Sequence, residues 1–257
     1  MLHPFHLVTL SPWPSLLCVN FVLFGINFIA WLKGFNENLL FSLINGLLIV
    51  VLWFRDILRE ALEGVHTLKV QSGLKKGFFI FVFSEVMLFI SFFWAFFNSS
   101  LGLNVLGNWP LVGIDKIDVL GIPLLGSLLL LSSGFFLTES EYYYSLGNKY
   151  KVINLFLIGL ILGTLFVIAQ GIEYYYSTFT LSDAVVGSVF YFTTGLHGIH
   201  VIVGVIFLTV AFIRIVTSSS TIEHKLGFIL SLTYWHIVDL IWLFVYISYY
   251  WFAFEIL

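Results

Sequence analysis

The chain has 257 residues, of which 60% are hydrophobic and only 10% are charged. A soluble domain has about 45–50% apolar and about 25% charged residues, so this composition excludes an ordinary soluble protein and indicates a protein that lipid solvates. The formal net charge of −3, without a large basic cluster, argues against nucleic-acid binding. The single cysteine, Cys18, excludes an internal disulfide and any metal site built from several cysteines.

Seven apolar runs have about the length that a transmembrane helix needs. In chain order, the expected spans are residues 15–31, 38–54, 76–98, 123–138, 152–176, 183–214 and 225–254. The second helix is expected to continue through RDILREALE to a C-terminal cap at Gly64. Ser182 is the expected N-cap of the sixth. The sequence therefore predicts an all-α membrane protein with a single polytopic domain over residues 1–257.

The lysines and arginines predict how the chain is oriented in the membrane. With the N-terminus inside, nine of the 11 basic residues fall in inside loops, namely Arg55, Arg59, Lys69, Lys75, Lys76, Lys149, Lys151, Arg214 and Lys225. Only Lys33 and Lys116 fall outside. Because basic residues accumulate on the inner side of membranes, the predicted topology is N-in and C-out.

Four spans carry one face of polar or small residues at the helical period. The faces comprise Ser84, Ser91, Ala95 and Asn98; Gly159, Gly163, Gln170 and Glu173; Thr193, His197, His200, Gly204 and Ala211; and Thr233, His236, Asp239, Tyr246 and Tyr250. Because polar faces inside a bilayer turn toward protein, helices 3–7 are expected to form one bundle. Helices 1 and 2 lack such a face and are expected to pack as a separate pair.

Three histidines lie within the spans. His197 and His200 are three residues apart, which permits a Zn or Cu site with a third ligand such as His236. Hydrogen bonding between helices, for example to Glu173 or Asp239, is the favoured interpretation because polar side chains commonly join membrane helices. His236 and Asp239 are likewise expected to form a structural pair in preference to a proton relay.

Glu85 lies in the middle of the apolar string FVFSEVMLF. An ionised carboxylate is costly there, so the favoured interpretation is a neutral acid hydrogen-bonded to a neighbouring helix. Proton handling and a polar contact with a bound lipid are the alternatives.

Arg55 and Arg59 are one helical turn apart at the inner end of the second span. Like charges at this spacing repel each other unless a negative group joins them. Asp56 and Glu63 can neutralise them, or a phospholipid phosphate can lie between them with His66 nearby. The positive-inside rule alone is a third explanation for two arginines at this place.

Several strings occur together along nearly the whole chain. They are HPFHLV and SPWP near the start, WFRD and GVHT around the end of the second span, SEVMLF and FFWAFF in the third, QGIEYY and SDAVVGS, and finally TGLHGIHV and YWHIVDLIWLFVY. In this order they resemble the third subunit of cytochrome c oxidase, in the haem–copper oxidase subunit III family. The TGLHGIHV and YWHIVD strings are the most specific.

The resemblance implies a helix 1–2 pair and a helix 3–7 bundle around a V-shaped cleft that holds phospholipid. It implies a subunit that has no haem, copper or catalytic residue of its own. Such a subunit flanks the haem-bearing catalytic subunit, supports proton uptake and protects that subunit from inactivation during turnover. Trp53, Arg55, Arg59 and His66 would contact phospholipid, and Glu85 matches the acidic residue of the family's third helix.

The expected complex is the proton-translocating oxidoreductase that passes electrons from cytochrome c to O2, in the mitochondrial inner membrane or a bacterial plasma membrane. Subunit III of a quinol oxidase is an alternative. A free-standing channel or transporter is disfavoured, because the span count is odd and no inverted repeat is visible. The string Glu139-Ser140-Glu141 departs from the family pattern and leaves open the contacts near the end of the fourth helix.

Overall fold

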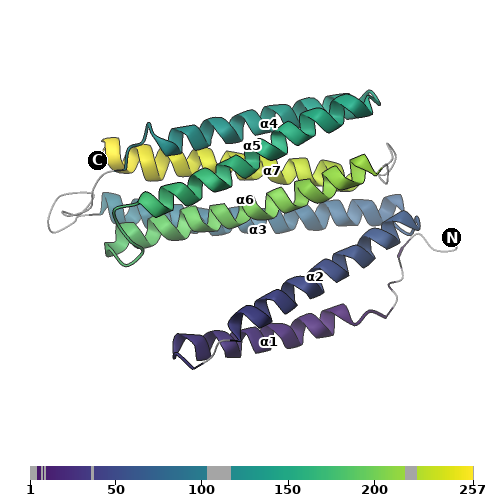
Figure 1. The fold of residues 1–257 in the computed structure, drawn as a ribbon, viewed down its shortest axis with the longest axis horizontal. Helices are drawn as coiled ribbons and strands as arrows, with labels where there is room; N and C mark the ends of the chain where they lie inside the picture. The colour runs from purple at the N-terminus through teal and green to yellow at the C-terminus, as the bar shows by residue number, and fades with distance from the viewer. Residues whose placement is uncertain are drawn as a thin grey trace. The chain divides into compact units, whose positions relative to one another are not determined.

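The computed structural model describes residues 5, 6, 8, 10–35, 38–102, 117–217 and 225–256. Its elements are α1 Trp13–Leu32, α2 Leu39–Leu62, α3 Leu68–Leu101, α4 Ile122–Ser145, α5 Lys149–Tyr176, α6 Ala184–Val216, α7 Leu226–Val245 and the π-helix η2 Tyr246–Ile256 (Figure 1). Within the described part of the chain, seven helices are long and apolar enough to cross a membrane. The all-α class and the seven predicted spans are confirmed.

The helices fall into two compact units, Met1–Lys76 and Gly77–Leu257. The first unit holds α1, α2 and the beginning of α3, and the second holds the rest of α3 and all later helices. The predicted single domain, the N-in orientation and the V-shaped cleft stay predictions.

In the first unit, α1 and α2 lie side by side (Figure 1). The Asn20 amide donates a hydrogen bond of 3.2 Å to the Ser42 carbonyl oxygen, and a Cβ atom at Gly46 would lie 2.6 Å from the Asn20 Oδ1 atom. A glycine is therefore needed where the polar side chain of α1 crosses α2. After α2, Gly64 has φ +76°, in the left-handed region, as the predicted helix cap requires.

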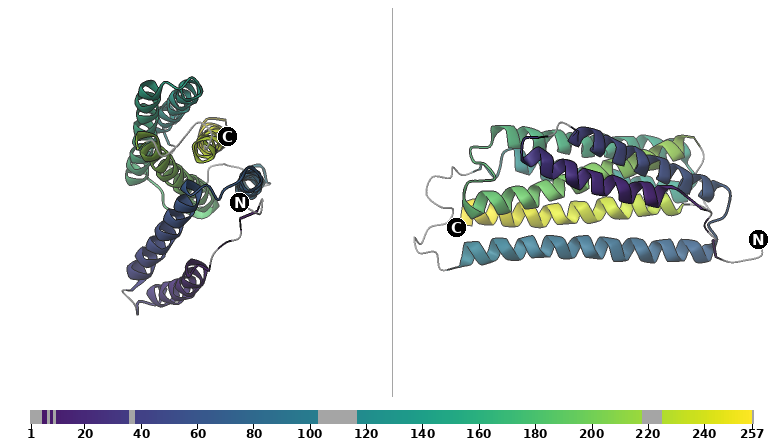
Figure 2. Two further views of the ribbon diagram at one scale, coloured as in Figure 1. Left: turned by 90° about the vertical axis from the view of Figure 1, so that its right-hand side faces the viewer. Right: turned by 90° about the horizontal axis from the view of Figure 1, so that it is seen from below.

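In the second unit, α4, α5, α6 and α7 run along one another (Figure 2). Glycines make the close contacts: a Cβ atom would lie 2.7 Å from Leu137 at Gly159, 2.5 Å from Trp235 at Gly163, and 3.0 Å from Trp235 at Gly204. These distances leave no room for a methyl group without movement of a neighbour. The predicted small-residue faces of α5 and α6 are thus the surfaces on which the bundle packs.

Two fully buried tryptophans of α7 join it to α4. The Trp235 indole N–H donates to the Ser133 hydroxyl at 2.9 Å, and the Trp242 indole N–H donates to the Ser127 hydroxyl at 3.0 Å. Because hydrocarbon offers no partner to an indole N–H, these two bonds favour one register of α7 along α4.

The largest departures from the predicted boundaries are in α3 and α4, and the N-cap of α6 also differs. α3 begins at Leu68 instead of residue 76, and α4 continues past Thr138 to Ser145. Charged residues beyond an apolar run can still be good helix formers, so the end of a span need not be the end of its helix. The N-cap of α6 is Asp183 and not Ser182.

The polar face predicted for α3 does not point into the bundle. Ser84 and Ser91 are exposed, and each donates a hydrogen bond of 2.6 Å to a carbonyl oxygen of its own helix. The buried face of α3 instead carries Val82, Phe89 and Phe96. A serine that bonds to its own helix backbone needs no partner elsewhere, so serines are weak markers of a buried face.

Candidate functional site

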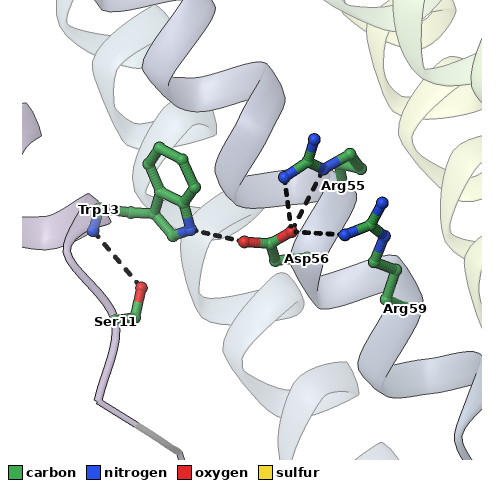
Figure 3. Close-up of polar contacts among 5 residues, drawn as sticks. All are labelled: Ser11, Trp13, Arg55, Asp56 and Arg59. Carbon is green, nitrogen blue, oxygen red and sulfur yellow. Dashed lines mark hydrogen bonds and ion pairs between the residues drawn. The ribbon is translucent and has the colours of Figure 1, made fainter.

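In the first unit, the carboxylate of Asp56 joins the two arginines of α2 (Figure 3). Its Oδ1 atom accepts hydrogen bonds from Arg55 at 3.2 and 3.1 Å and lies 3.8 Å from the nearest Arg59 guanidinium nitrogen. One carboxylate is thus shared between two guanidinium groups. Both arginine side chains remain well exposed, at 48% for Arg55 and 64% for Arg59.

The first residue of α1 bonds to the other oxygen of this carboxylate. The Trp13 indole N–H donates a 2.8 Å hydrogen bond to the Asp56 Oδ2 atom (Figure 3). One turn further along α2, the His6 Nε2 atom lies 3.1 Å from the Glu60 Oε2 atom. His6, before α1, and Trp13, at the start of α1, therefore bind two acidic residues that lie one turn apart on α2.

A cavity of about 810 Å³ opens within the first unit beside these contacts. The polar residues that line it include Trp13, Asp56, Arg59, Glu60, Glu63 and His66. The aromatic side chain of Trp53 also lines it. Of the residues expected to bind lipid, Trp53, Arg59 and His66 line this cavity, whereas Arg55 reaches it only through the Asp56 carboxylate.

Burial lowers the pKa of His66 below its ordinary value, the nearby His6 lowers it further, and Glu60 acts in the opposite direction. Because a histidine with a lowered pKa is neutral at pH 7, His66 supplies hydrogen bonding and no charge to the cavity. Any attraction for a phosphate group must therefore come from the arginines.

In the second unit, Glu85 of α3 contacts His200 of α6. The Glu85 Oε2 and His200 Nε2 atoms are 2.8 Å apart, and the His200 Nδ1 atom lies 2.8 Å from the Leu196 carbonyl oxygen. A carbonyl oxygen only accepts, so Nδ1 carries a proton. The Glu85–His200 contact then holds one further proton, either on the carboxyl oxygen or on Nε2. The pair is neutral overall in both cases.

The other two span histidines also bond to a second helix. The fully buried His197 on α6 donates from Nε2 to the Val238 carbonyl oxygen of α7 at 3.2 Å. The His236 Nε2 atom on α7 lies 3.3 Å from the Thr138 hydroxyl of α4. For His197 and His200, the residues that bond to the rings are not the suggested Glu173 and Asp239, because periodicity indicates a face of a helix and not the residue opposite it.

Glu173 and Asp239 have different surroundings. The carboxylate of Glu173 accepts a 2.7 Å hydrogen bond from the buried Tyr250 hydroxyl of η2. Asp239 of α7 is 9% exposed. It faces α4 at Gly134, where an added Cβ atom would lie 3.1 Å from the Asp239 Oδ2 atom. The same Cβ atom would lie 3.6 Å from the Nδ1 atom of His236. The expected structural pair of His236 and Asp239 stays a prediction, and nothing in the sequence indicated that both side chains face Gly134.

Among the residues that the structure describes, no group of three or more His, Cys, Asp or Glu side chains is arranged to hold a metal ion. Both ring nitrogens of His200 already have partners, and the Nε2 atoms of His197 and His236 have theirs. These bonds join His200 to α3, His197 to α7 and His236 to α4, and they leave the Nδ1 atom of His197 without a hydrogen-bond partner among the described residues.

Sequence reasoning missed Trp13, His6 and Thr138 as partners of charged or polar groups. Trp13 and His6 lie in the strings HPFHLV and SPWP, so the resemblance contained a signal for them. Thr138 is the last residue of the predicted fourth span, where a polar residue needs no special explanation.

A model of the protein family described as "Cytochrome c oxidase subunit III" matches residues 3–254 of the chain. The chain is similar to "Cytochrome c oxidase subunit 3" of the yeast Yarrowia lipolytica, with 43% identity over 97% of this chain and 95% of the relative. Proteins of the same name from Pisaster ochraceus and Triticum aestivum are each 42% identical over 97% of this chain, and the matches cover 97% and 96% of these relatives.

We expect Glu85→Ala to destabilise the second unit by about 1–3 kcal/mol, because it leaves the His200 ring without its partner on α3. Glu85→Gln should cost much less, since an amide N–H can donate to the His200 Nε2 atom. Thermal unfolding of the purified protein measures both, with Ser84→Ala as the control on the exposed side of the same helix turn. Equal effects of Glu85→Ala and Ser84→Ala would contradict the assignment.

Proposed function

The chain belongs to the cytochrome c oxidase subunit III family, and on that premise we propose that it is the non-catalytic subunit that flanks and stabilises the haem-bearing subunit of the respiratory oxidase. The complex passes electrons from cytochrome c to O2 and is coupled to proton pumping. The family match over nearly the whole chain carries this proposal. The relatives come from fungi, animals and plants, and the seven apolar helices suit a multi-pass protein of the mitochondrial inner membrane.

The competing functions are less well supported. The relatives are named as subunits of a cytochrome c oxidase, which does not favour a quinol oxidase. A free-standing channel or transporter has no support from the family.

The haem and copper of the complex belong to partner subunits under this proposal. The engaged ring nitrogens of His197, His200 and His236 support that division, because in this chain they join helices to one another. The contribution of this subunit to catalysis is then indirect, through stabilisation of its partner and support of proton uptake.

We expect the chain to co-purify with a haem-bearing partner from mitochondrial membranes in mild detergent. After stringent separation, the partner-free chain should have no stoichiometric haem or copper. Affinity purification followed by optical spectroscopy and metal analysis tests both points. Purification of the chain without any haem-bearing partner would contradict the proposed assembly, and haem bound to the separated chain would contradict the division of roles.

We also propose that the cavity of the first unit binds a phospholipid headgroup. The Asp56 carboxylate cancels only one of the two positive charges of Arg55 and Arg59, so these three side chains together keep a net charge of about +1. An arginine near an anionic headgroup contributes on the order of 1 kcal/mol. Arg59 lies at the cavity and its side chain is 64% exposed, which leaves its guanidinium accessible to a phosphate.

The remaining charges favour a zwitterionic headgroup over a purely anionic one. Three carboxylates line the cavity, those of Asp56, Glu60 and Glu63, against the single guanidinium of Arg59. A phosphate can bind beside the arginine while an attached ammonium group faces the carboxylates. The apolar lining, which includes Trp53, suits the first part of an acyl chain.

We expect the double variant Arg55→Gln, Arg59→Gln to lower the occupancy of this lipid by about tenfold or more, because two charges of on the order of 1 kcal/mol each are lost. Native mass spectrometry of the assembled complex measures the bound lipid. The matched control is Lys75→Gln, Lys76→Gln, which removes the same charge from the same unit away from the cavity lining. A full lipid complement in the arginine variant would leave the arginines as determinants of topology only.

A further inference from the structure

Glu173 of α5 is a buried residue whose side chain opens on a cavity of the second unit. It is 8% exposed and lies three residues before Tyr176, the last residue of its helix. It lines a cavity of about 300 Å³ together with the start of α4, the segment after α5 and Phe190 of α6. Asp118 and Thr178, which are exposed, line the same cavity. Water that enters beside them can therefore reach the Glu173 carboxyl group.

No positive charge in the described part of the chain balances Glu173. The lining of the cavity contains no lysine, arginine or histidine, and the ion pairs of the described residues do not include Glu173. The other carboxylate of the lining, Asp118, adds negative charge to the same cavity. Burying an ionised carboxylate without a counter-ion is costly inside a membrane protein. The surroundings of Glu173 thus favour the neutral acid.

The hydrogen bond from Tyr250 indicates which oxygen of Glu173 carries the proton. The Tyr250 hydroxyl donates to the Glu173 Oε1 atom at 2.7 Å, so Oε1 acts as an acceptor. The Oε2 atom has no bond to a described residue, and it is not one of the side-chain atoms that are sealed from the surface without a partner. Oε2 is therefore the oxygen that meets the cavity. A proton on Oε2 leaves the Tyr250 bond in place and can exchange with water.

We propose that Glu173 is a proton-binding site that exchanges with water in this cavity and is coupled to Tyr250 of η2. When Oε2 takes a proton from water, the carboxyl group is neutral and its carbonyl oxygen still accepts from Tyr250. When the proton returns to water, the same hydroxyl donates to an ionised carboxylate, which is a stronger acceptor. The buried Tyr250 ring lies 5.9 Å from Trp242 and 5.3 Å from Phe190, between ring centroids. The proton thus changes the strength of a bond that joins α5 to η2 within the core.

The other titratable groups of the cavity lining are Asp118, Tyr174 and Tyr176. Asp118 accepts a hydrogen bond of 3.1 Å from the backbone N–H of Leu120. The Tyr174 hydroxyl lies 2.6 Å from the Thr194 hydroxyl of α6, and Tyr176 is exposed. Asp118 and Tyr174 are thus bound elsewhere, and the hydroxyl that bonds to Glu173 comes from η2.

Infrared difference spectroscopy of the assembled complex tests the proton site. A protonated carboxyl group has its own C=O band, which shifts when deuterium replaces the proton. We expect a band that Glu173→Gln removes, that fades as the pH of the medium is raised and that shifts in D2O. Glu173→Asp should keep a carboxyl band at a changed position, and it serves where Glu173→Gln does not assemble. If no band depends on Glu173, or if the band responds neither to pH nor to D2O, the proposal is wrong.

Tyr250→Phe tests the coupling, because it removes the hydroxyl that donates to Oε1. A carbonyl group that loses a hydrogen bond vibrates at higher frequency, so we expect the Glu173 band to move in that direction. The matched control is Tyr249→Phe on the same π-helix, whose hydroxyl donates to the Phe92 carbonyl oxygen of α3 at 3.0 Å. The control should leave the band in place. An unmoved band in Tyr250→Phe, or an equal shift in the control, would overturn the coupling.

Discussion

Hydrocarbon offers no hydrogen-bond partners, so each polar group within a membrane span needs a partner in the protein. Polar side chains of the spans meet this constraint in two ways, whereas the Gln170 Nε2, His197 Nδ1 and Asp239 Oδ1 atoms have no partner among the described residues. Serine and threonine hydroxyls such as those of Ser84 and Thr209 donate to carbonyl oxygens of their own helices. Histidine, tryptophan, tyrosine and carboxylate groups are larger and reach other helices, as in the contacts of Glu85 with His200 and of Glu173 with Tyr250. These longer contacts fix which helices are neighbours.

Close packing depends on the same contacts. Gly163 allows the Trp235 ring to enter between α5 and α7, and the Trp235 indole then reaches Ser133 on α4. A larger residue at position 163 would displace the ring and with it the hydrogen bond. The polar contacts and the small residues therefore act as one system, in which the glycines provide the approach and the polar groups select the register.

The sequence predicted the elements and the buried faces of α5 and α6 well, the face of α3 wrongly and the partners poorly. Hydropathy gave seven spans, Gly64 was identified as a helix cap, and the faces of Gln170 and His197 do point into the bundle. Periodicity indicates the direction of a side chain relative to its own axis, but it carries no information on the neighbouring helix. For that reason the contact between Glu85 and His200, separated by 115 residues, was not predicted. The π-helix at the end of α7 was also unpredicted, because its apolar pattern resembles that of an α-helix.

Each histidine of the bundle is held by a particular partner, and the positions of the ring protons test this arrangement. Nitrogen NMR of the 15N-histidine-labelled complex distinguishes protonated from bare ring nitrogens, with assignments from His197→Gln and His200→Gln. The hydrogen bonds predict a proton on Nε2 and none on Nδ1 for His197, and a proton on Nδ1 for His200. A proton on Nδ1 of His197, or a bare Nδ1 on His200, would contradict the account.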